Sequence, residues 1–218
     1  MDNNVLIEKI ISKERLEPYL SRHKEDINKA LMHYKGNIHI SKSFYPLLAI
    51  LEVGVRNLID YHLTTFFNDR RWYENKEFLS LASRFQIDRI SEAKAKRLCE
   101  KKEVTPSRII SEFSFGFWTS LFDTRFDMTL WKCLRLTFPN CPKKIRKRKT
   151  ISCKLNTIRK LRNRIFHHEA ISWNLDVLDK YRLELIEGIE WLDKGLLDWI
   201  VDLNHINVTI EKYRKTII

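Results

Sequence analysis

The residues of this sequence whose types suit chemistry lie together in Arg162-Asn163-Arg164-Ile165-Phe166-His167-His168. Histidine titrates near neutral pH, so His167 can take a proton from a hydroxyl group such as a ribose 2′-OH. Arg162 offers a permanent charge on a planar fork, which suits a phosphate that gains negative charge in a transition state. Asn163 is four residues before His167 and shares its helix face, where it can orient the histidine or donate to the phosphate. These three residues predict cleavage of RNA without a metal.

Such a displacement also needs an acid on the side of the phosphate opposite the base, and one histidine cannot stand on both sides. On an ideal helix His168 points about 100° away from His167, so we expect it only in a supporting role. A two-fold axis would bring in a second copy of His167. The residues therefore predict a homodimer with a composite active site.

Positive charge is concentrated in the segment that contains this motif. The 218 residues carry a net charge of +12, yet no Asp or Glu lies between Met128 and His168. That stretch holds 13 of the 40 basic residues, which leaves 27 against all 28 acidic residues in the rest of the chain. The block predicts a polyanion site such as RNA, the alternative being a solvated face. The candidate RNA-binding residues are Lys143, Lys144, Arg146, Lys147, Arg148, Lys149, Lys154, Arg159, Lys160 and Arg164.

The motif must be positioned by a helix, which the apolar spacing predicts over residues 151–169. Its apolar stripe is Ile151, Leu155, Ile158 and Ile165, and Arg162 takes the position that the stripe leaves open. A guanidinium beside a buried stripe costs free energy unless it is paired or faces a polar cleft. Arg162 therefore marks the place where this helix is expected to face a site.

The other elements also favour an all-α fold. Few glycines and prolines, and no alternation of strands with helices, predict one helical domain over residues 1–218, with residues 1–36 as a candidate peripheral arm. Gly36 and Asn37 are expected to end a helix before a buried one over residues 44–67. A further amphipathic helix is predicted over residues 176–202. The last segment, 205–218, is ambiguous between helix and extended chain.

Several functional classes are not expected. The four cysteines form no CxxC pair, so a zinc site or a disulfide framework is not predicted. Adjacent histidines diverge on a helix and no HExxH spacing occurs, so we predict no metal and no cofactor. A signal peptide and an uncharged apolar run of 18 residues are both missing from the sequence, which predicts a cytoplasmic protein that does not enter a membrane.

Arg162-Asn163-x-x-x-His167 resembles the Arg-Asn-x-x-x-His signature of the HEPN superfamily of helical ribonucleases, and further motifs resemble its Abi-like family (abortive infection, AbiD/AbiF type). The resemblance implies a HEPN-like helical bundle with additional peripheral helices. It also implies a metal-independent endoribonuclease with dimeric composite sites, acting in phage defence or as a toxin, with Arg162, Asn163 and His167 as the catalytic set. The matches run in order from Phe44 to Trp173 and comprise Leu51-Glu52-Val53-Gly54-Val55-Arg56-Asn57, Ser114-Phe115-Gly116-Phe117-Trp118, and His167-His168-Glu169 followed by Ile171 and Trp173.

Supporting residues and partners remain to be assigned within this resemblance. Glu52 and Arg56 are four apart and can pair, so Glu52 is expected either to hold Arg162 or His167 or to form only a structural salt bridge; Asn57 follows them in the same motif. Some relatives carry a modified tyrosine two residues after the histidine, where this chain has Glu169, and whether an antitoxin protein or RNA is a partner is left open. The rival hypothesis is a non-catalytic module that binds RNA or protein through the basic segment 143–164.

Overall fold

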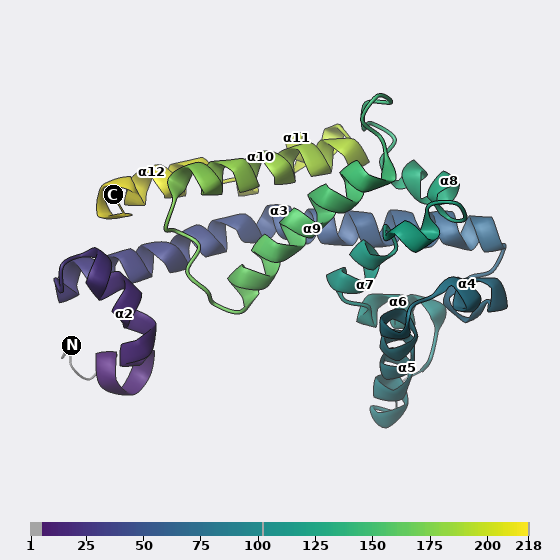
Figure 1. Cartoon of the computed structure of the whole chain (residues 1–218), viewed down its shortest axis with the longest axis horizontal. Coiled ribbons are helices and arrows are strands. Elements are labelled where there is room, and N and C mark those ends of the chain that lie inside the picture. Colours follow the sequence, from purple (N-terminus) through teal and green to yellow (C-terminus); the bar gives the residue numbers. More distant parts are fainter. Residues whose placement is uncertain (1–5, 102, 218) are drawn as a thin grey trace. The chain divides into compact units, whose positions relative to one another are not determined.

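The computed structural model describes residues 6–101 and 103–217, and the predicted all-α class is confirmed. The chain is 76% helical, and the described residues contain no strand (Figure 1). Besides the π-helical turn η1 (Leu6–Ile11), short 3-10 turns are η2 (Trp72–Glu74), η3 (Thr124–Phe126), η4 (Arg135–Thr137) and η5 (Val201–Leu203). The α-helices are α2 (Lys13–Arg22), α3 (Ile27–Phe67), α4 (Lys76–Leu81), α5 (Arg84–Cys99), α6 (Pro106–Glu112), α7 (Phe115–Ser120), α8 (Trp131–Leu134), α9 (Arg148–Phe166), α10 (Leu175–Leu192), α11 (Gly195–Trp199) and α12 (Ile206–Ile217).

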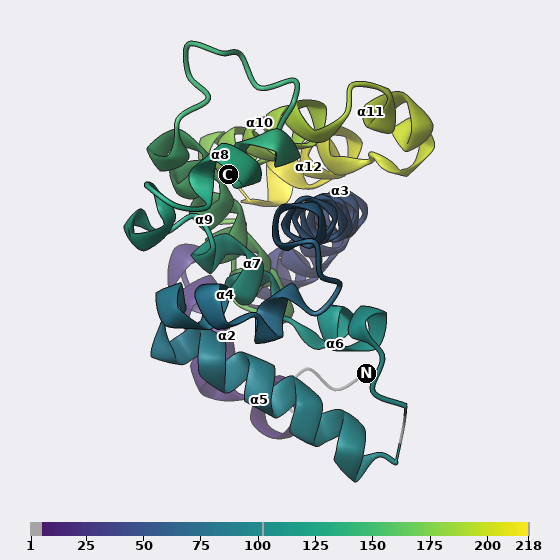
Figure 2. The ribbon, with the colours of Figure 1, turned by 90° about the vertical axis from the view of Figure 1, so that its right-hand side faces the viewer.

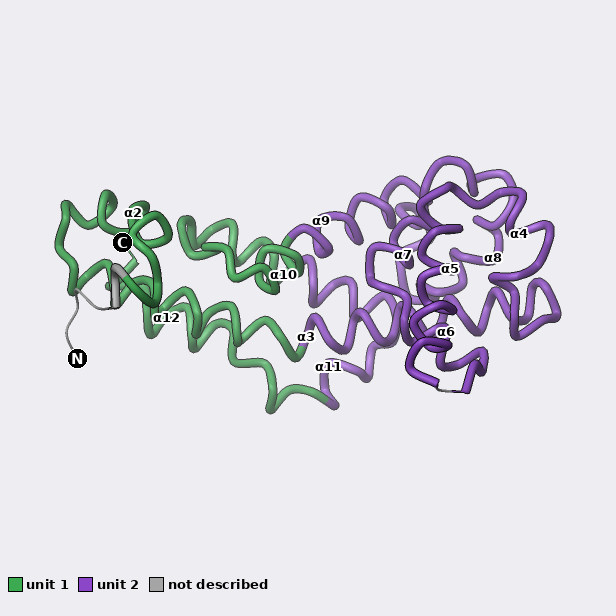
Figure 3. Tube along the Cα trace, turned by 90° about the horizontal axis from the view of Figure 1, so that it is seen from below, with its two compact units in different colours: residues 1–46, 161–183, 200–218 green, residues 47–160, 184–199 purple. Residues whose placement is uncertain are grey.

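The helices belong to two compact units (Figure 3). The first comprises residues 1–46, 161–183 and 200–218, and the second comprises residues 47–160 and 184–199. The long helices α3, α9 and α10 each continue from one unit into the other. The predicted triad at the end of α9 therefore belongs to the first unit, and most of the basic segment belongs to the second.

Helix α3 runs without interruption through Gly36 and Asn37, so the prediction that these residues end a helix is wrong. Gly36 is buried, and a Cβ atom there would lie 2.9 Å from Cδ1 of Tyr213 in α12. The glycine thus permits α12 to approach closely. Asn37 is also buried, and its Oδ1 accepts hydrogen bonds from the amides of Ile171 and Ser172 at 2.8 and 3.1 Å. Tertiary contacts explain both residues better than helix propensity does.

The composition of α3 also bears on the membrane prediction. Helix α3 is long enough to cross a membrane, and one 18-residue window of it is apolar enough to do so. In this structure 39% of that window is buried. The core helix of a soluble protein has the same length and composition. Leu47, Leu51 and Val55 of α3 are fully buried in this structure. The absence of a membrane-spanning segment remains a prediction.

The core of the first unit ties α2 to the beginning of α3. Leu16, Tyr19 and Leu20 of α2 are buried together with Ala30 of α3, and partly buried Trp173 packs against them. Residues 13–36 of the predicted peripheral arm therefore contribute directly to this core. The C-terminal segment, left ambiguous by the sequence, is the helix α12, with Ile206, Ile210 and Ile217 buried.

Aromatic side chains fill the core of the second unit. Trp72, Phe117 and Trp118 are fully buried, and the rings of Phe113 and Phe117 are stacked with centroids 4.1 Å apart. The motif 114–118 therefore supplies core packing and not a surface for stacking on RNA. All four cysteines are free thiols, with Cys133 and Cys141 buried and Cys99 and Cys153 exposed.

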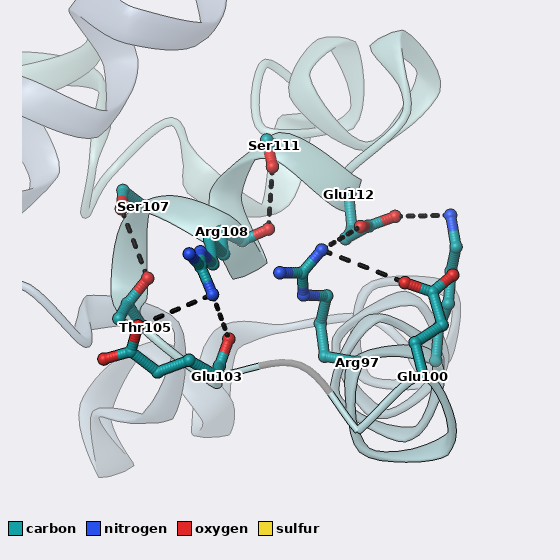
Figure 4. Close-up of polar contacts among 9 residues, drawn as sticks. Arg97, Glu100, Glu103, Thr105, Ser107, Arg108, Ser111 and Glu112 are labelled. Atoms are coloured by element: carbon teal, nitrogen blue, oxygen red, sulfur yellow. Dashed lines mark hydrogen bonds and ion pairs between the residues drawn. The ribbon is translucent and has the colours of Figure 1, made fainter.

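Ion pairs join α5 and α6, which lie side by side in both views (Figures 1 and 2). Glu112 at the end of α6 accepts from Lys96 at 2.6 Å and from Arg97 at 3.4 Å (Figure 4). The Arg97 side chain is only 11% exposed, so solvent screens this pair less than a surface pair. Arg108 of α6 pairs with Glu103, in the segment before that helix, at 3.5 Å. The contacts of Glu112 with Lys96 and Arg97 therefore join α6 to α5.

The predicted helix over residues 176–202 is too long at its C-terminal end. Helix α10 stops at Leu192, and the Asp193 carboxylate accepts a hydrogen bond from the Gly195 amide at 2.7 Å. This local bond begins a separate short helix, α11. The N-terminal end lies within one residue of the prediction, because α10 begins at Leu175, where Asn174 Oδ1 accepts from the amides of Asp176 and Val177 at 2.9 and 3.2 Å.

Candidate functional site

The candidate site lies where α9 ends, three residues earlier than predicted. The last helical residue is Phe166. The His168 amide donates to the Ile165 carbonyl at 3.0 Å, the Glu169 amide donates to the Arg164 carbonyl at 2.8 Å, and His168 has φ 57°. This pattern is a Schellman motif, in which one left-handed residue reverses the chain and satisfies the last helical carbonyls. A histidine takes the position that glycine usually occupies.

The left-handed conformation of His168 corrects its predicted orientation. The expected angle of about 100° from His167 assumed that both residues are helical, and His168 is not. Its carbonyl accepts a hydrogen bond from the guanidinium of Arg15 in α2. The supporting role of His168 in this structure is therefore to shape and anchor the turn.

The chain beyond the turn is also held in place. Arg164 Nε lies 3.3 Å from Oε2 of Glu169, and another nitrogen of its guanidinium donates to the carbonyl of Ala170. Asn37 Nδ2 donates to the Glu169 carbonyl at 3.4 Å, in addition to the two amides that its Oδ1 binds. Arg164, predicted to bind RNA, uses its guanidinium to close the turn.

Buried His33, with half-buried His23 beside it, anchors the next residues. His33 in α3 is fully buried, with Nε2 3.0 Å from Ser172 Oγ and Nδ1 3.0 Å from Nε2 of His23. Burial, together with the charges of His23 and Arg22, lowers the pKa of His33 to about 4. His33 is therefore neutral at physiological pH. From the sequence alone His33 is predicted to be a surface or turn residue, and its burial shows that this prediction is wrong.

The predicted catalytic residues all lie at this anchored end of α9. The guanidinium carbon of Arg162 lies 4.4 Å from the centroid of the Phe166 ring, one turn further along α9. This cation–π contact explains how an arginine beside the apolar stripe is accommodated. Asn163 is half-buried, and its carbonyl accepts from the amide of exposed His167 at 2.8 Å. The predicted set thus comprises an exposed histidine and a partly sheltered arginine.

The predicted RNA-binding residues differ in their availability. Arg146 donates to the carbonyls of Phe138 and Pro139, and Arg148 donates to the carbonyl of Phe122 at 2.7 Å and pairs with Asp127. Arg146 thus stabilises the loop before α9, and Arg148 joins the first turn of α9 to the segment that contains Phe122 and Asp127. The exposed members of the set are Lys143, Lys144, Lys147, Lys149 and Lys160.

Lys154 does not fit the predicted surface. Its side chain is 8% exposed, its ammonium group pairs with Glu184 and with Glu187, at 2.6 Å from the latter, and it lies 4.7 Å from the centroid of the Trp191 ring. Arg159 is half-buried and donates to Oδ1 of Asn156 at 2.9 and 3.2 Å. The side chains of Lys154 and Arg159 therefore make contacts within the second unit and do not belong to the exposed basic surface.

The predicted supporting residues of α3 lie in the second unit. Glu52 and Arg56 are half-buried, Asn57 is exposed, and Arg56 Nε donates to Oδ1 of Asn57 at 3.1 Å. Arg162 and His167 belong to the first unit and Glu52 to the second. That Glu52 holds one of them therefore stays a prediction. As for metals, no three His, Cys, Asp or Glu side chains converge on a common point within residues 6–101 and 103–217.

A scan against protein-family models, a search of curated proteins and a search of solved structures each gave no match. The likeness to the HEPN superfamily is therefore carried by the motifs quoted above.

Proposed function

We propose that this protein is a metal-independent endoribonuclease of the HEPN type. The observation that supports the proposal best is the C-terminal end of α9, where half-buried Arg162 and Asn163 lie in the helix and exposed His167 directly follows its last residue, Phe166. Their side chains offer a permanent cation, an amide and an imidazole, which suit charge stabilisation, orientation and proton transfer in RNA cleavage. The resemblance to Abi-like proteins assigns the activity to phage defence or to a toxin.

The proposed reaction is a transesterification. His167 takes the proton of a ribose 2′-OH, and the resulting oxygen attacks the adjacent phosphorus as the bond to the 5′ oxygen breaks. Arg162 stabilises the charge that grows on the phosphate, and Asn163 orients the histidine or the phosphate. His167 of the partner subunit in a homodimer gives a proton to the leaving 5′ oxygen. The products are a 2′,3′-cyclic phosphate and a 5′-hydroxyl.

The exposed lysines of the basic segment complete the proposal. Lys143, Lys144, Lys147 and Lys149 lie in the turn before α9 or in its first turn, where long flexible cations can contact phosphates. Such contacts give affinity without sequence preference. These lysines are proposed to bind the RNA backbone.

Incubation of the purified protein with RNA in the presence of EDTA tests the activity. The wild type should cut the RNA and His167→Ala should not, whereas His205→Ala, at another exposed histidine, should cut like the wild type. Equal cleavage by wild type and His167→Ala would refute the assignment. A protein that is strictly monomeric at the assay concentration and fully active would refute the composite site.

The exposed lysines also favour a second candidate function, a non-catalytic module that binds RNA or a protein partner. Such a module needs the basic side chains and does not need the imidazole of His167. Replacing Lys143, Lys144, Lys147 and Lys149 by alanine should then abolish binding, while His167→Ala binds normally and the wild type leaves the RNA intact.

A further inference from the structure

A cavity of about 400 Å³ lies in the first unit beside the anchored turn, and His168 and Phe166 form part of its lining. The opposite wall is one face of α3, with Ile38, Lys42 and Tyr45. The volume is typical of pockets for small ligands. All the residues that line it belong to the first unit, so the pocket depends on that unit alone.

Two aromatic rings form the open part of this pocket. Tyr45 is 56% exposed and Phe166 is 43% exposed, and their ring centroids are 6.1 Å apart with planes inclined at 46°. The tilt leaves the two rings unstacked on each other, so part of their faces remains open to a flat ligand. Exposed aromatic rings of this kind bind single-stranded nucleic acids by stacking on the bases.

The polar groups of the pocket distinguish its ligand. Asn37 lines the pocket, but its side chain is already hydrogen-bonded to the amides of Ile171 and Ser172 and to the carbonyl of Glu169. The hydroxyls of Ser41 and Tyr45 have no hydrogen-bond partner among the described residues, and Lys42 adds an exposed cation. The described lining residues include no carboxylate. An aromatic ligand with hydrogen-bonding edges and a nearby negative charge fits these groups.

We infer that this pocket binds one nucleobase of a single-stranded RNA, adjacent to the bond whose cleavage His167 is proposed to catalyse. The base stacks on Tyr45, the Ser41 hydroxyl contacts its edge, and Lys42 pairs with a neighbouring phosphate. The inference rests on the proposed function, because it places the base beside the proposed cleavage site. It makes Tyr45 a specificity-determining residue and not a catalytic one.

Binding measurements on a non-cleaving protein test the pocket by itself. His167→Ala protein is titrated into fluorescein-labelled 12-nucleotide oligo(U) and oligo(A) RNA, and the Kd is read from fluorescence anisotropy. Adding Tyr45→Ala should raise the Kd for at least one RNA about tenfold, as loss of a base–aromatic stack does. Tyr45→Phe, which keeps the ring, should stay within about twofold of the parent.

Matched controls lie on the same helix outside the pocket. Tyr61→Ala removes another exposed tyrosine of α3. Lys42→Ala should also raise the Kd for RNA, and its control is Lys35→Ala, at an exposed lysine of α3 outside the pocket. Neither control should change the Kd. If Tyr45→Ala and Tyr61→Ala bind RNA equally well, the inference is wrong. It is also wrong if Tyr45→Ala leaves the Kd unchanged and lowers the mass in sedimentation equilibrium, because the pocket is then an interface between copies of the chain.

Cleavage assays in the wild-type background separate this inference from the proposed function. If the wild type leaves RNA intact while Tyr45→Ala still weakens RNA binding, the endoribonuclease proposal fails and the pocket stands. If the wild type cuts RNA while Tyr45→Ala binds equally and cuts the same bonds at the same rate, the pocket fails and the endoribonuclease proposal stands.

Discussion

The guanidinium of Arg162 lies over the ring of Phe166, with 4.4 Å between the guanidinium carbon and the ring centroid. The two residues are one helical turn apart at the end of α9, so the helix itself sets their distance. A cation–π contact at a partly exposed site contributes about 0.5–1 kcal/mol. The ring thus limits the orientations of the side chain that is proposed to hold the scissile phosphate.

Arg162→Lys should lower the rate of RNA cleavage by about 10²–10³-fold, as the loss of one donor to a developing oxyanion does. Lysine keeps the charge but lacks the planar fork that binds a phosphate through two nitrogens. The measurement is single-turnover cleavage at saturating protein. The Kd for RNA, measured in the His167→Ala background, should change by less than about threefold. Cleavage at the wild-type rate would contradict the role assigned to Arg162.

His168→Gly should stabilise the protein by about 0.5–1 kcal/mol, because glycine adopts the left-handed conformation without the cost that a side chain imposes. For a chain of this length such a gain corresponds to a rise in Tm of about 1–4 °C, which scanning calorimetry can measure. His168→Ala keeps a side chain at φ 57° and should show no comparable rise. Cleavage should persist in both variants, since the imidazole of His168 has no part in the proposed reaction.

Folding stability should fall as the pH is lowered from about 7 to 4. The pKa of His33 is about 4 in the folded protein, against 6.5 for an exposed histidine, so between these values the unfolded chain binds more protons. The folded state therefore loses up to about 3 kcal/mol across this window, and the loss levels off below pH 4. Urea denaturation at a series of pH values measures it.

His33→Gln is the matched control for this pH dependence, because glutamine cannot be protonated. The variant should be less stable than the wild type at pH 7 and should show a smaller loss of stability between pH 7 and 4. A wild-type free energy of unfolding that is constant over this range would show that His33 titrates normally.

Two lysines of α9 should behave in opposite ways. Lys154→Ala removes a buried cation from Glu184 and Glu187, which are 28% and 47% exposed and can regain water, so the free energy of unfolding should fall by about 1–3 kcal/mol. Lys149→Ala, at an exposed position, should leave stability unchanged. In binding measurements Lys149→Ala should weaken RNA binding and reduce the slope of log Kd against log salt concentration by about 1. Lys154→Ala should leave that slope unchanged.

The sequence alone determined the helical class and the concentration of positive charge, and it supplied the residues that are proposed as the triad. Helix periodicity is local, because residues three and four apart meet on one face whatever the rest of the chain does. Arg162 and Asn163 could therefore be placed on the last turn of one helix from their spacing. The exposed lysines before α9 also follow from local features, since the loop at Pro139 to Pro142 precedes them.

Only the tertiary structure decided where the helices end and which polar side chains bind partners inside the protein instead of facing solvent. Gly36 interrupts nothing because Tyr213 packs against it, and α9 ends at Phe166 because His168 takes a left-handed conformation that Arg15 helps to hold. Lys154 looks like any lysine of the basic segment until Glu184 is brought beside it. These outcomes depend on contacts with residues far away in the sequence, and helix periodicity, which is a local pattern, cannot predict such contacts.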